Sequence, residues 1–180
     1  MLALAGALRN QWPVLYNLMI LEGPILEVGS GSGKACVLAK RLCPEKQVVA
    51  LDVARQTTRF IRGLMQYTKT SVDVVNGDVL HLPFRTNSIG IVFSVGMLEH
   101  YPDDWIITAL REQARIAKRV LVSVPLIHYE NFRLHGDERL LTKSAWLRLL
   151  EEVAPLADIS FIGPITEEYW LQAILDTEGD

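Results

Sequence analysis

The sequence predicts an α/β fold: a doubly wound, Rossmann-like, largely parallel sheet with helices on both faces. Short β-rich apolar runs alternate with helix-like segments along the 180 residues. A glycine-rich turn follows the first apolar run, and no internal repeat or linker interrupts the order. Such alternation is typical of parallel strands that are buried on both faces. We therefore expect one domain, residues 1–180, that begins with an N-terminal helical segment over residues 1–22.

The predicted elements follow from local signals. Pro13 suits the first turn of a helix, and Gly23-Pro24 ends that helix before the first strand. Thr142 is a typical N-cap of a later helix. In chain order, the sequence predicts helices over residues 13–21, 35–43, 54–68, 103–118 and 142–153, and strands over residues 47–51, 71–75, 89–95, 120–124, 158–162 and 169–175.

Residues 25–34 read ILEVGSGSGK and place three glycines at alternate positions. A strand, a glycine turn and a helix together bring backbone N–H groups close to a nucleotide-like ligand. A phosphate-binding P-loop is excluded, because only three residues separate Gly29 from Gly33 and Ala35 stands where Ser or Thr is needed. A dinucleotide-binding loop is disfavoured, because Lys34 occupies the position where Gly or Ala packs the helix on the strand. The acid-x-Gly-x-Gly-x-Gly loop of S-adenosylmethionine (SAM) binders matches at every position from Glu27.

Composition is that of an ordinary globular protein, with 49% apolar and 22% charged residues. A net charge of -3 gives no general attraction to nucleic acid or anionic membrane. Cys36 and Cys43 are seven residues apart on one predicted helix, too far apart to bridge and without metal-ligand spacing. We expect two buried free thiols, no metal site, no targeting segment, no membrane span and a cytoplasmic location.

Two acids follow predicted strands. Asp52 ends the second strand, 19 residues after Gly33, where a carboxylate can accept both hydroxyls of a ribose. The alternative is a loop acid that caps the next helix. Asp78 follows the third strand, where it can accept from an adenine amine beside Val79; the alternative is a turn aspartate that bonds its own backbone.

A basic stripe lies on the helix after Asp52. Arg55, Arg59 and Arg62 fall on one helical face, Lys69 follows, and residues 53–72 contain no acid. A solvated helix face explains such a stripe more simply than an anionic substrate or RNA does. Without clustered aromatics or a basic appendage, we expect no nucleic-acid partner.

The ordered motifs resemble class I SAM-dependent methyltransferases, in particular the small-molecule group that includes ubiquinone and menaquinone biosynthesis enzymes. The resemblance runs along nearly the whole chain: ILEVGSGSG, VVALDV, GDVLHLPF, IVFSVGMLEHYPD, Leu110-Arg111-Glu112, VLVSVP and GDERLLTKSAWLRLLEE. It implies a seven-stranded sheet, mostly parallel with an antiparallel last strand. Two positions depart from the family pattern: Gly90 replaces a usual acid, and residues 117–119 replace a common Pro-Gly-Gly turn.

The resemblance also implies a cofactor site for SAM. The glycine loop would hold the methionine moiety, Asp52 the ribose, Asp78 the adenine, and the end of the fourth strand the sulfonium. The implied residues are Glu27, Gly29, Ser30, Gly31, Gly33, Asp52, Val53, Asp78, Val79, Ser94, Val95 and Gly96.

The methyl acceptor is not readable from the sequence, and a small molecule is expected. A general base is needed only if the acceptor must lose a proton. His100, His128, Tyr129 and His135 are candidates. The alternative, which we favour, is that His100 caps or packs the loop of residues 97–101 and that the other three are ordinary polar loop residues.

Three functions remain open: a SAM-dependent methyltransferase, a non-catalytic SAM-fold partner or regulatory subunit, and a nicotinamide-dependent oxidoreductase. Lys34 and the absence of a Tyr-x-x-x-Lys arrangement disfavour the oxidoreductase.

Overall fold

The computed structural model describes residues 18–20, 22–127, 136–162 and 170–177, and within 160–162 it describes the backbone only. Residues 18–20 are helical; the rest of the predicted N-terminal helix lies outside the described residues. The strands are β1 (Ile25–Val28), β2 (Val48–Asp52), β3 (Asp73–Asn76), β4 (Ile89–Val95), β5 (Ala117–Pro125), β6 (Leu156–Ile162) and β7 (Trp170–Asp176). The helices are α2 (Lys34–Leu42), α3 (Arg55–Thr68), the short 3₁₀ turn η1 (Leu98–His100), α4 (Asp103–Ile116) and α5 (Lys143–Glu151).

The seven strands form one sheet in the order β3-β2-β1-β4-β5-β7-β6. The first five strands pair in parallel, and β7 lies antiparallel to both β5 and β6. The predicted doubly wound sheet with an antiparallel last strand is therefore confirmed. The strand order reverses between β1 and β4, the place where ligands bind in such sheets.

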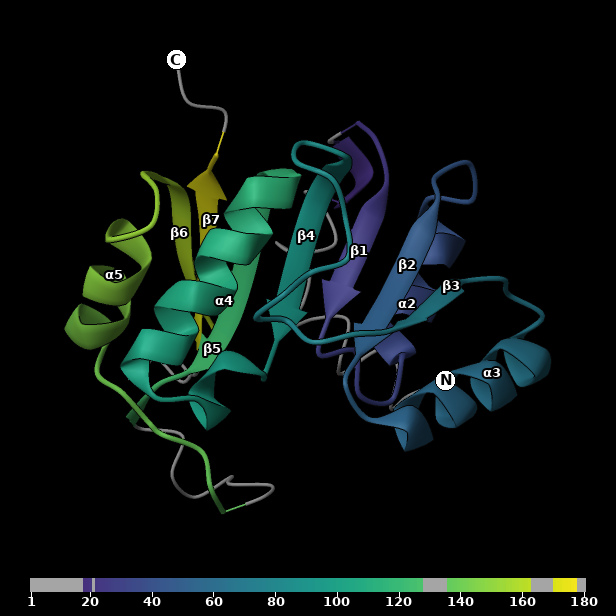
Figure 1. The fold of residues 1–180 in the computed structure, drawn as a ribbon, viewed down its shortest axis with the longest axis horizontal. Helices are drawn as coiled ribbons and strands as arrows, with labels where there is room; N and C mark the ends of the chain where they lie inside the picture. The colour runs from purple at the N-terminus through teal and green to yellow at the C-terminus, as the bar shows by residue number, and fades with distance from the viewer. Residues whose placement is uncertain (1–17, 21, 128–135, 163–169, 178–180) are drawn as a thin grey trace.

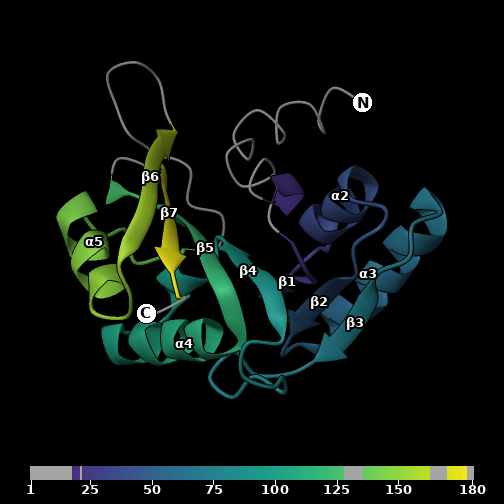
Figure 2. The same ribbon diagram turned by 90° about the horizontal axis from the view of Figure 1, so that it is seen from above.

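Two apolar clusters lie on the two faces of the sheet. One joins the inward side chains of α4 and α5 to residues such as Val92 and Val122. The other joins α2 and α3 to residues such as Ile91 and Phe93. Figure 2 shows the same division, with α4 and α5 on one side of the sheet and α2 and α3 on the other. The alternation of Ile91, Val92 and Phe93 between the faces is the period-2 pattern of a strand buried on both sides.

The predicted element boundaries differ from the observed ones by up to three residues, and the difference between α4 and β5 has a clear physical cause. The helix predicted to reach Lys118 ends at Ile116, and β5 begins at the next residue, Ala117, whose backbone is extended. Ala117 pairs with Ile89 of β4, and Arg119 pairs with both β4 and β7. Strand pairing therefore overrides the helix-forming character of residues 117–119, and no turn takes the place of the family's Pro-Gly-Gly segment.

The second departure from the family pattern has a steric cause. Gly90 lies inside β4, where its N–H donates to the carbonyl of Pro24 over 3.0 Å. A Cβ at this position would lie 2.0 Å from the carbonyl oxygen of Glu22. Glycine is needed here because the chain entering β1 crosses directly over β4.

The predicted buried thiols are confirmed, since Cys36 and Cys43 are both free and buried. Within the described ranges, no helix is long and apolar enough to cross a membrane. The same ranges contain no group of three His, Cys, Asp or Glu side chains that could hold a metal ion.

Candidate functional site

The glycine loop joins β1 to α2 at the edge where the parallel strands end (Figure 1). Gly29, Gly31 and Gly33 all have left-handed backbone conformations, with φ of 65°, 47° and 70°. Side chains other than glycine resist this conformation. The alternate glycines therefore let the chain make a tight turn from the strand into the helix, as the sequence predicts.

The three glycines meet different surroundings. A Cβ at Gly33 would lie 2.5 Å from Ile61 of α3, and one at Gly29 would lie 2.4 Å from Met97. The nearest atom to a Cβ on Gly31 is 3.9 Å away, and Gly31 is exposed. Gly33 and Gly29 thus permit close packing within the protein, while Gly31 leaves open space above the loop.

Asp52 ties this loop to β2. One carboxylate oxygen accepts from the N–H of Gly31 over 2.9 Å, and the other accepts from the N–H of Ala54 over 2.8 Å. The second bond is a turn bond to the residue before α3, and no side chain caps this helix, so the alternative role of a helix cap is not what Asp52 performs. Each oxygen keeps acceptor capacity, because an ionised carboxylate offers about four lone-pair sites. These two backbone bonds and ligand binding are therefore compatible at Asp52.

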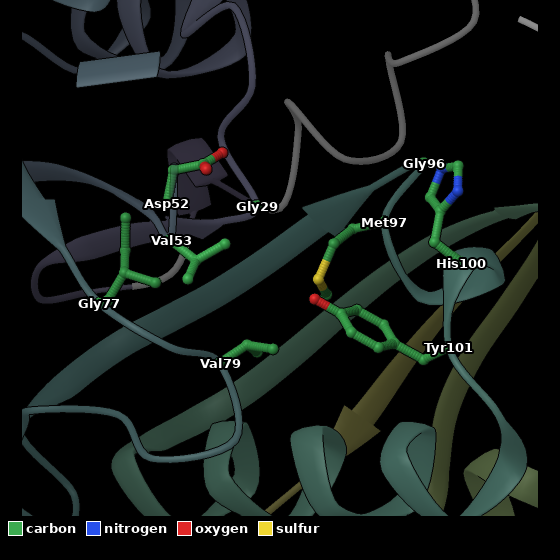
Figure 3. Close-up of a pocket in the computed structure, with 10 residues that line it drawn as sticks. Gly29, Asp52, Val53, Gly77, Val79, Gly96, Met97, His100 and Tyr101 are labelled. Carbon is green, nitrogen blue, oxygen red and sulfur yellow. The ribbon is translucent and has the colours of Figure 1, made fainter. Parts of the chain in front are cut away.

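A cavity of about 180 Å³ opens beside Asp52, at the ends of β1, β2, β3 and β4. Figure 3 shows its lining side chains around a common space. Five predicted cofactor residues line it: Gly29, Asp52, Val53, Val79 and Gly96. Five others complete the wall: Leu51, Gly77, Met97, His100 and Tyr101.

Tyr101 is a site residue that the sequence reasoning did not single out. Its ring lines the cavity, with the hydroxyl directed into the space near Met97 (Figure 3), and stacks on Trp105 at a centroid distance of 6.0 Å. Burial raises the pKa of Tyr101, and the nearby carboxylates of Asp78 and Asp52 raise it further. The Tyr101 phenol is therefore a neutral hydrogen-bond donor on the cavity wall. The signal available in the sequence was the pair of aromatic residues Tyr101 and Trp105, spaced four residues apart at the start of a predicted helix.

Glu27 lies beneath the loop instead of lining the cavity. Its Oε2 accepts from the backbone N–H of Cys36 over 3.0 Å and from the Cys36 thiol over 2.7 Å. Burial raises the pKa of Glu27 from 4.5 to about 7, while these two bonds lower it. Burial also raises the pKa of the Cys36 thiol, so the thiol keeps its proton and donates it. Glu27 is thus a buried acid with a pKa of about 7 that is hydrogen-bonded to the first turn of α2.

The remaining predicted cofactor residues surround the cavity without lining it. Asp78 is exposed, and its Oδ1 accepts from the N–H of Leu80 over 2.9 Å, the turn geometry considered as its alternative. Ser30 and Ser94 are buried, and neither hydroxyl has a partner among the described residues. Val95 is half-buried at the end of β4.

His100 is the one candidate base that the structure describes. Its Nδ1 lies 3.0 Å from Oδ1 of Asp137, and its ring lines the cavity. His128, Tyr129 and His135 lie outside the described residues.

Glu99, next to His100, is a second residue that sequence reasoning missed. Only 3% of it is exposed, and its Oε2 has no partner within the described part of the chain. Burial raises the pKa of Glu99 from 4.5 to about 7, and the nearby Glu138 and Asp137 raise it further. The N–H of Arg139 donates to the Glu99 carbonyl over 2.9 Å, so the segment after 135 covers this acid. The site therefore has a buried acid near each end, Glu27 below the glycine loop and Glu99 after β4, and burial raises the pKa of both to about 7.

Comparison with known proteins supports this description. A family model described as "Methyltransferase domain" matches residues 25–119, more than half of the chain. A malonyl-[acyl-carrier protein] O-methyltransferase of Xylella fastidiosa is 33% identical over 70 residues, which are 39% of this chain and 23% of that protein. The chain thus aligns with under a quarter of that relative's length.

Solved structures of low sequence identity share the fold. A Pyrococcus horikoshii protein superposes with a TM-score of 0.80 at 15% identity, over 96% of this chain and 90% of that one. A SAM-dependent methyltransferase of Aquifex aeolicus gives a TM-score of 0.75 at 17% identity, over 92% and 88% of the two chains. With the family match, the seven-stranded sheet and the glycine loop, these findings show that the chain belongs to the methyltransferase-domain family and has the class I fold of SAM-dependent methyltransferases.

Proposed function

We propose that this protein transfers a methyl group from SAM to a small-molecule acceptor and that SAM binds in the cavity beside Asp52. The observation that carries the proposal is the link from Gly31 to Asp52, because it fixes the glycine loop and the strand-end acid around one cavity. The family match over residues 25–119 supports the same function.

The residues present fit a nucleoside with a zwitterionic tail. The free acceptor sites of Asp52 suit ribose hydroxyls, and Leu51 and Val79 give apolar walls for a flat base. A volume of about 180 Å³ is below the ~300–1,000 Å³ of sites that enclose a whole ligand, so part of SAM would lie over the open side of Gly31.

SAM, when bound, supplies a methyl group already activated by a positive sulfur. The protein then has to align the acceptor and exclude water, and alignment alone lowers a barrier by about 7–11 kcal/mol. Gly96 and Met97 form the wall at the end of β4, beside His100 and the buried Glu99. We assign the acceptor to this side, where His100 can take a proton if the acceptor has one to lose.

SAM binding is the direct test. In calorimetric titrations, Asp52→Ala should weaken SAM binding at least about tenfold, since a charge-assisted hydrogen bond contributes roughly 1.5–3 kcal/mol. Asp52→Asn should weaken SAM binding less than Asp52→Ala does if its side chain keeps one hydrogen bond to a ribose hydroxyl. The matched control is Asp73→Ala, an exposed acid at the start of the neighbouring β3. Equal SAM affinity in Asp52→Ala and Asp73→Ala would overturn the ribose assignment, and binding of NAD without SAM would overturn the family function.

Turnover separates the enzyme from a non-catalytic partner with the same fold. The panel of acceptors should include carboxylates carried on a thioester, because the relative's name states an O-methyltransferase that acts on a malonyl carrier protein. Formation of S-adenosylhomocysteine that depends on the acceptor supports the enzyme. His100→Ala should then slow turnover with SAM affinity unchanged within about threefold, which separates a role at the acceptor from one at the cofactor.

A further inference from the structure

The most exposed large apolar side chains of the described residues are Phe60 and Tyr67 on α3 and Val53 just before it. Tyr67 is 88% exposed, Phe60 74% and Val53 65%, and every other large apolar residue described as exposed has a lower value. Phe60 and Tyr67 are seven residues apart, two helical turns or about 10 Å. Single exposed apolar side chains are common on protein surfaces. Aromatic side chains that line up in a stripe along one helix instead indicate a contact surface.

Gly63 forms a notch between the two aromatic side chains. It lies three residues after Phe60 and four before Tyr67, on the same face of the helix. Apart from the neighbouring backbone of α3 itself, nothing lies within 4 Å of a Cβ placed on Gly63, so the space above it is open. Glycine costs a helix interior about 1 kcal/mol relative to alanine. Close approach of a second backbone is the usual benefit of such a residue at a helix–helix contact.

The charges of α3 lie to one side of this stripe and have one sign. Arg55, Arg59, Arg62 and Lys69 are exposed, and none forms an ion pair with any residue that the structure describes. Residues 53–72 contain no acid, although the whole chain has a net charge of -3. The sequence alone favours a solvated helix face for this stripe, but the structure adds two exposed aromatic side chains on the same helix and no described carboxylate that pairs with these charges. The uniform sign therefore points to a partner that brings the negative charges.

We propose that this face of α3 docks an acidic amphipathic helix of a partner protein, a function that does not depend on the proposed methyl transfer. Apolar side chains of the partner would pack on Phe60 and Tyr67 across the Gly63 notch. Carboxylates at the edges of its apolar stripe would pair with the arginines, which bind carboxylates in a fork geometry.

Three other occupants fit less well. A second copy that used the same face would set like charges against each other. Single-stranded nucleic acid stacks successive bases on neighbouring aromatics, whereas Phe60 and Tyr67 are about two turns apart. An anionic membrane takes helices with a broad apolar face, whereas Gln56 and Gln66 narrow the stripe on α3.

The location gives the docked helix access to the methyl-transfer site. α3 packs on α2, β2 and β3, and no other labelled element covers its outer side in the two views (Figures 1 and 2). Val53, at the entrance to α3, also lines the cavity. A partner that extends along α3 to Val53 would therefore reach the rim of the cavity.

The experiment uses two synthetic three-heptad helices with leucine at the a and d positions. One has glutamate and the other lysine at the e and g positions. Binding to the full chain is measured by fluorescence anisotropy at low salt, and the contact is mapped by amide chemical shifts. The glutamate helix should bind at least about tenfold more tightly than the lysine helix, with shifts confined to α3 and its neighbours.

Variants locate the contact. The double variant Arg59→Glu/Arg62→Glu should weaken binding of the glutamate helix at least about tenfold. The double variant Phe60→Ser/Tyr67→Ser should weaken the same binding at least about fivefold. The matched control is Arg148→Glu, an exposed arginine on α5, which should change binding less than about twofold. Circular dichroism and SAM affinity establish that each variant is folded.

Several results would overturn the proposal. These are equal binding of the two helices, binding that the α3 variants leave intact, and no binding of either helix. Tighter binding of an RNA oligomer, or of phosphatidylcholine vesicles with about 30% phosphatidylserine, would reassign the face to nucleic acid or membrane. Self-association that is lost in Phe60→Ser would reassign it to a second copy.

Discussion

The helices α3 and α4 are both 14 residues long and lie on opposite faces of the same sheet, yet they differ in almost every other respect. α3 buries one side chain, Ile61. α4 buries five: Ile106, Ala109, Leu110, Gln113 and Ile116. Since burial of an aliphatic side chain stabilises by about 1.5–3 kcal/mol, α4 contributes far more to the free energy of folding.

The charged residues of the two helices also differ in how well they suit the helix dipole. α4 begins with Asp103 and Asp104 and has Arg115 in its last turn, which suits the helix dipole at both ends. α3 begins with Arg55 and has no acid in its first turn, so its charge opposes the dipole there. Arg111 and Arg115 of α4 pair with carboxylates, whereas the arginines of α3 pair with none of those described. One helix stabilises the fold, and the other positions the glycine loop and presents a surface.

The largest expected effect tests this difference in the core. Leu110→Ala in α4 should lower the free energy of unfolding by about 2–5 kcal/mol, because Leu110 is fully buried. Leu64→Ala in α3 should cost about 1 kcal/mol, because Leu64 is only partly buried. Urea denaturation of both variants measures the two losses. Equal losses would contradict the assignment of stability to α4.

The second effect concerns pH at the turn before α4. The pKa of Glu99 is raised from 4.5 to about 7, so the native state holds its proton more tightly than the unfolded chain does. Stability from this group is full below about pH 4.5 and is lost as the pH rises towards 7. Glu99→Gln should remove that loss and be more stable than the parent at pH 8, by on the order of 1–3 kcal/mol.

Unfolding curves at pH 5 and pH 8 measure this effect, and Glu151→Gln, an exposed acid on α5, is the matched control. The pKa of Glu27 is also about 7, so Glu27 makes the unfolding free energy depend on pH in the same way in the parent and in Glu99→Gln. Its contribution therefore cancels when the two proteins are compared. A variant that follows the parent at both pH values would show that Glu99 is charged in the native state.

The third effect compares paired and unpaired charges. Glu112 accepts from Arg115 over 2.7 Å and from the N–H of Leu82 over 2.8 Å. Glu112→Gln should cost about 1–2 kcal/mol, while Arg59→Gln on α3 should change stability by less than about 0.5 kcal/mol. The bonds from Arg115 lower the pKa of Glu112, so this contribution is present above the unfolded pKa and disappears as the pH falls through the folded one. Thermal unfolding near pH 7 and below pH 3 checks both statements.

Much of this fold could be predicted from the sequence because local signals agree with the tertiary structure. β-branched runs such as Val48–Asp52 form buried strands, and Thr142 caps α5 by accepting from the N–H of Ala145. The end of α4 could not be predicted, because residues 117–119 have helix-forming character. Their pairing with β4 and β7 decides the boundary, and both partners are distant in sequence.

The candidate site could be predicted where it depends on short motifs. The glycine loop and Asp52 meet as expected, since both follow from the order of strand, turn and acid. Glu99 could not be predicted, because its burial depends on a segment far along the chain. Arg139, for example, donates to the Glu99 carbonyl from 40 residues away (139 − 99). The residues predicted to bind SAM stay predictions until binding is measured.

The smallest expected effect separates aromatic side chains that stabilise the fold from those that do not. Trp105 of α4 is 47% exposed and stacks on Tyr101, so Trp105→Ser should cost about 1 kcal/mol of unfolding free energy. Phe60→Ser and Tyr67→Ser should each cost less than about 0.5 kcal/mol, because both side chains stand in water and serine has a similar helix propensity. Urea denaturation of the three variants gives the comparison. A loss above about 1 kcal/mol in either α3 variant would mean that these aromatics pack within the protein, and the reason to assign them to a partner would disappear. If the losses are small, the chain keeps two large apolar side chains in solvent without gain in stability, which is the expected signature of a surface that binds another molecule.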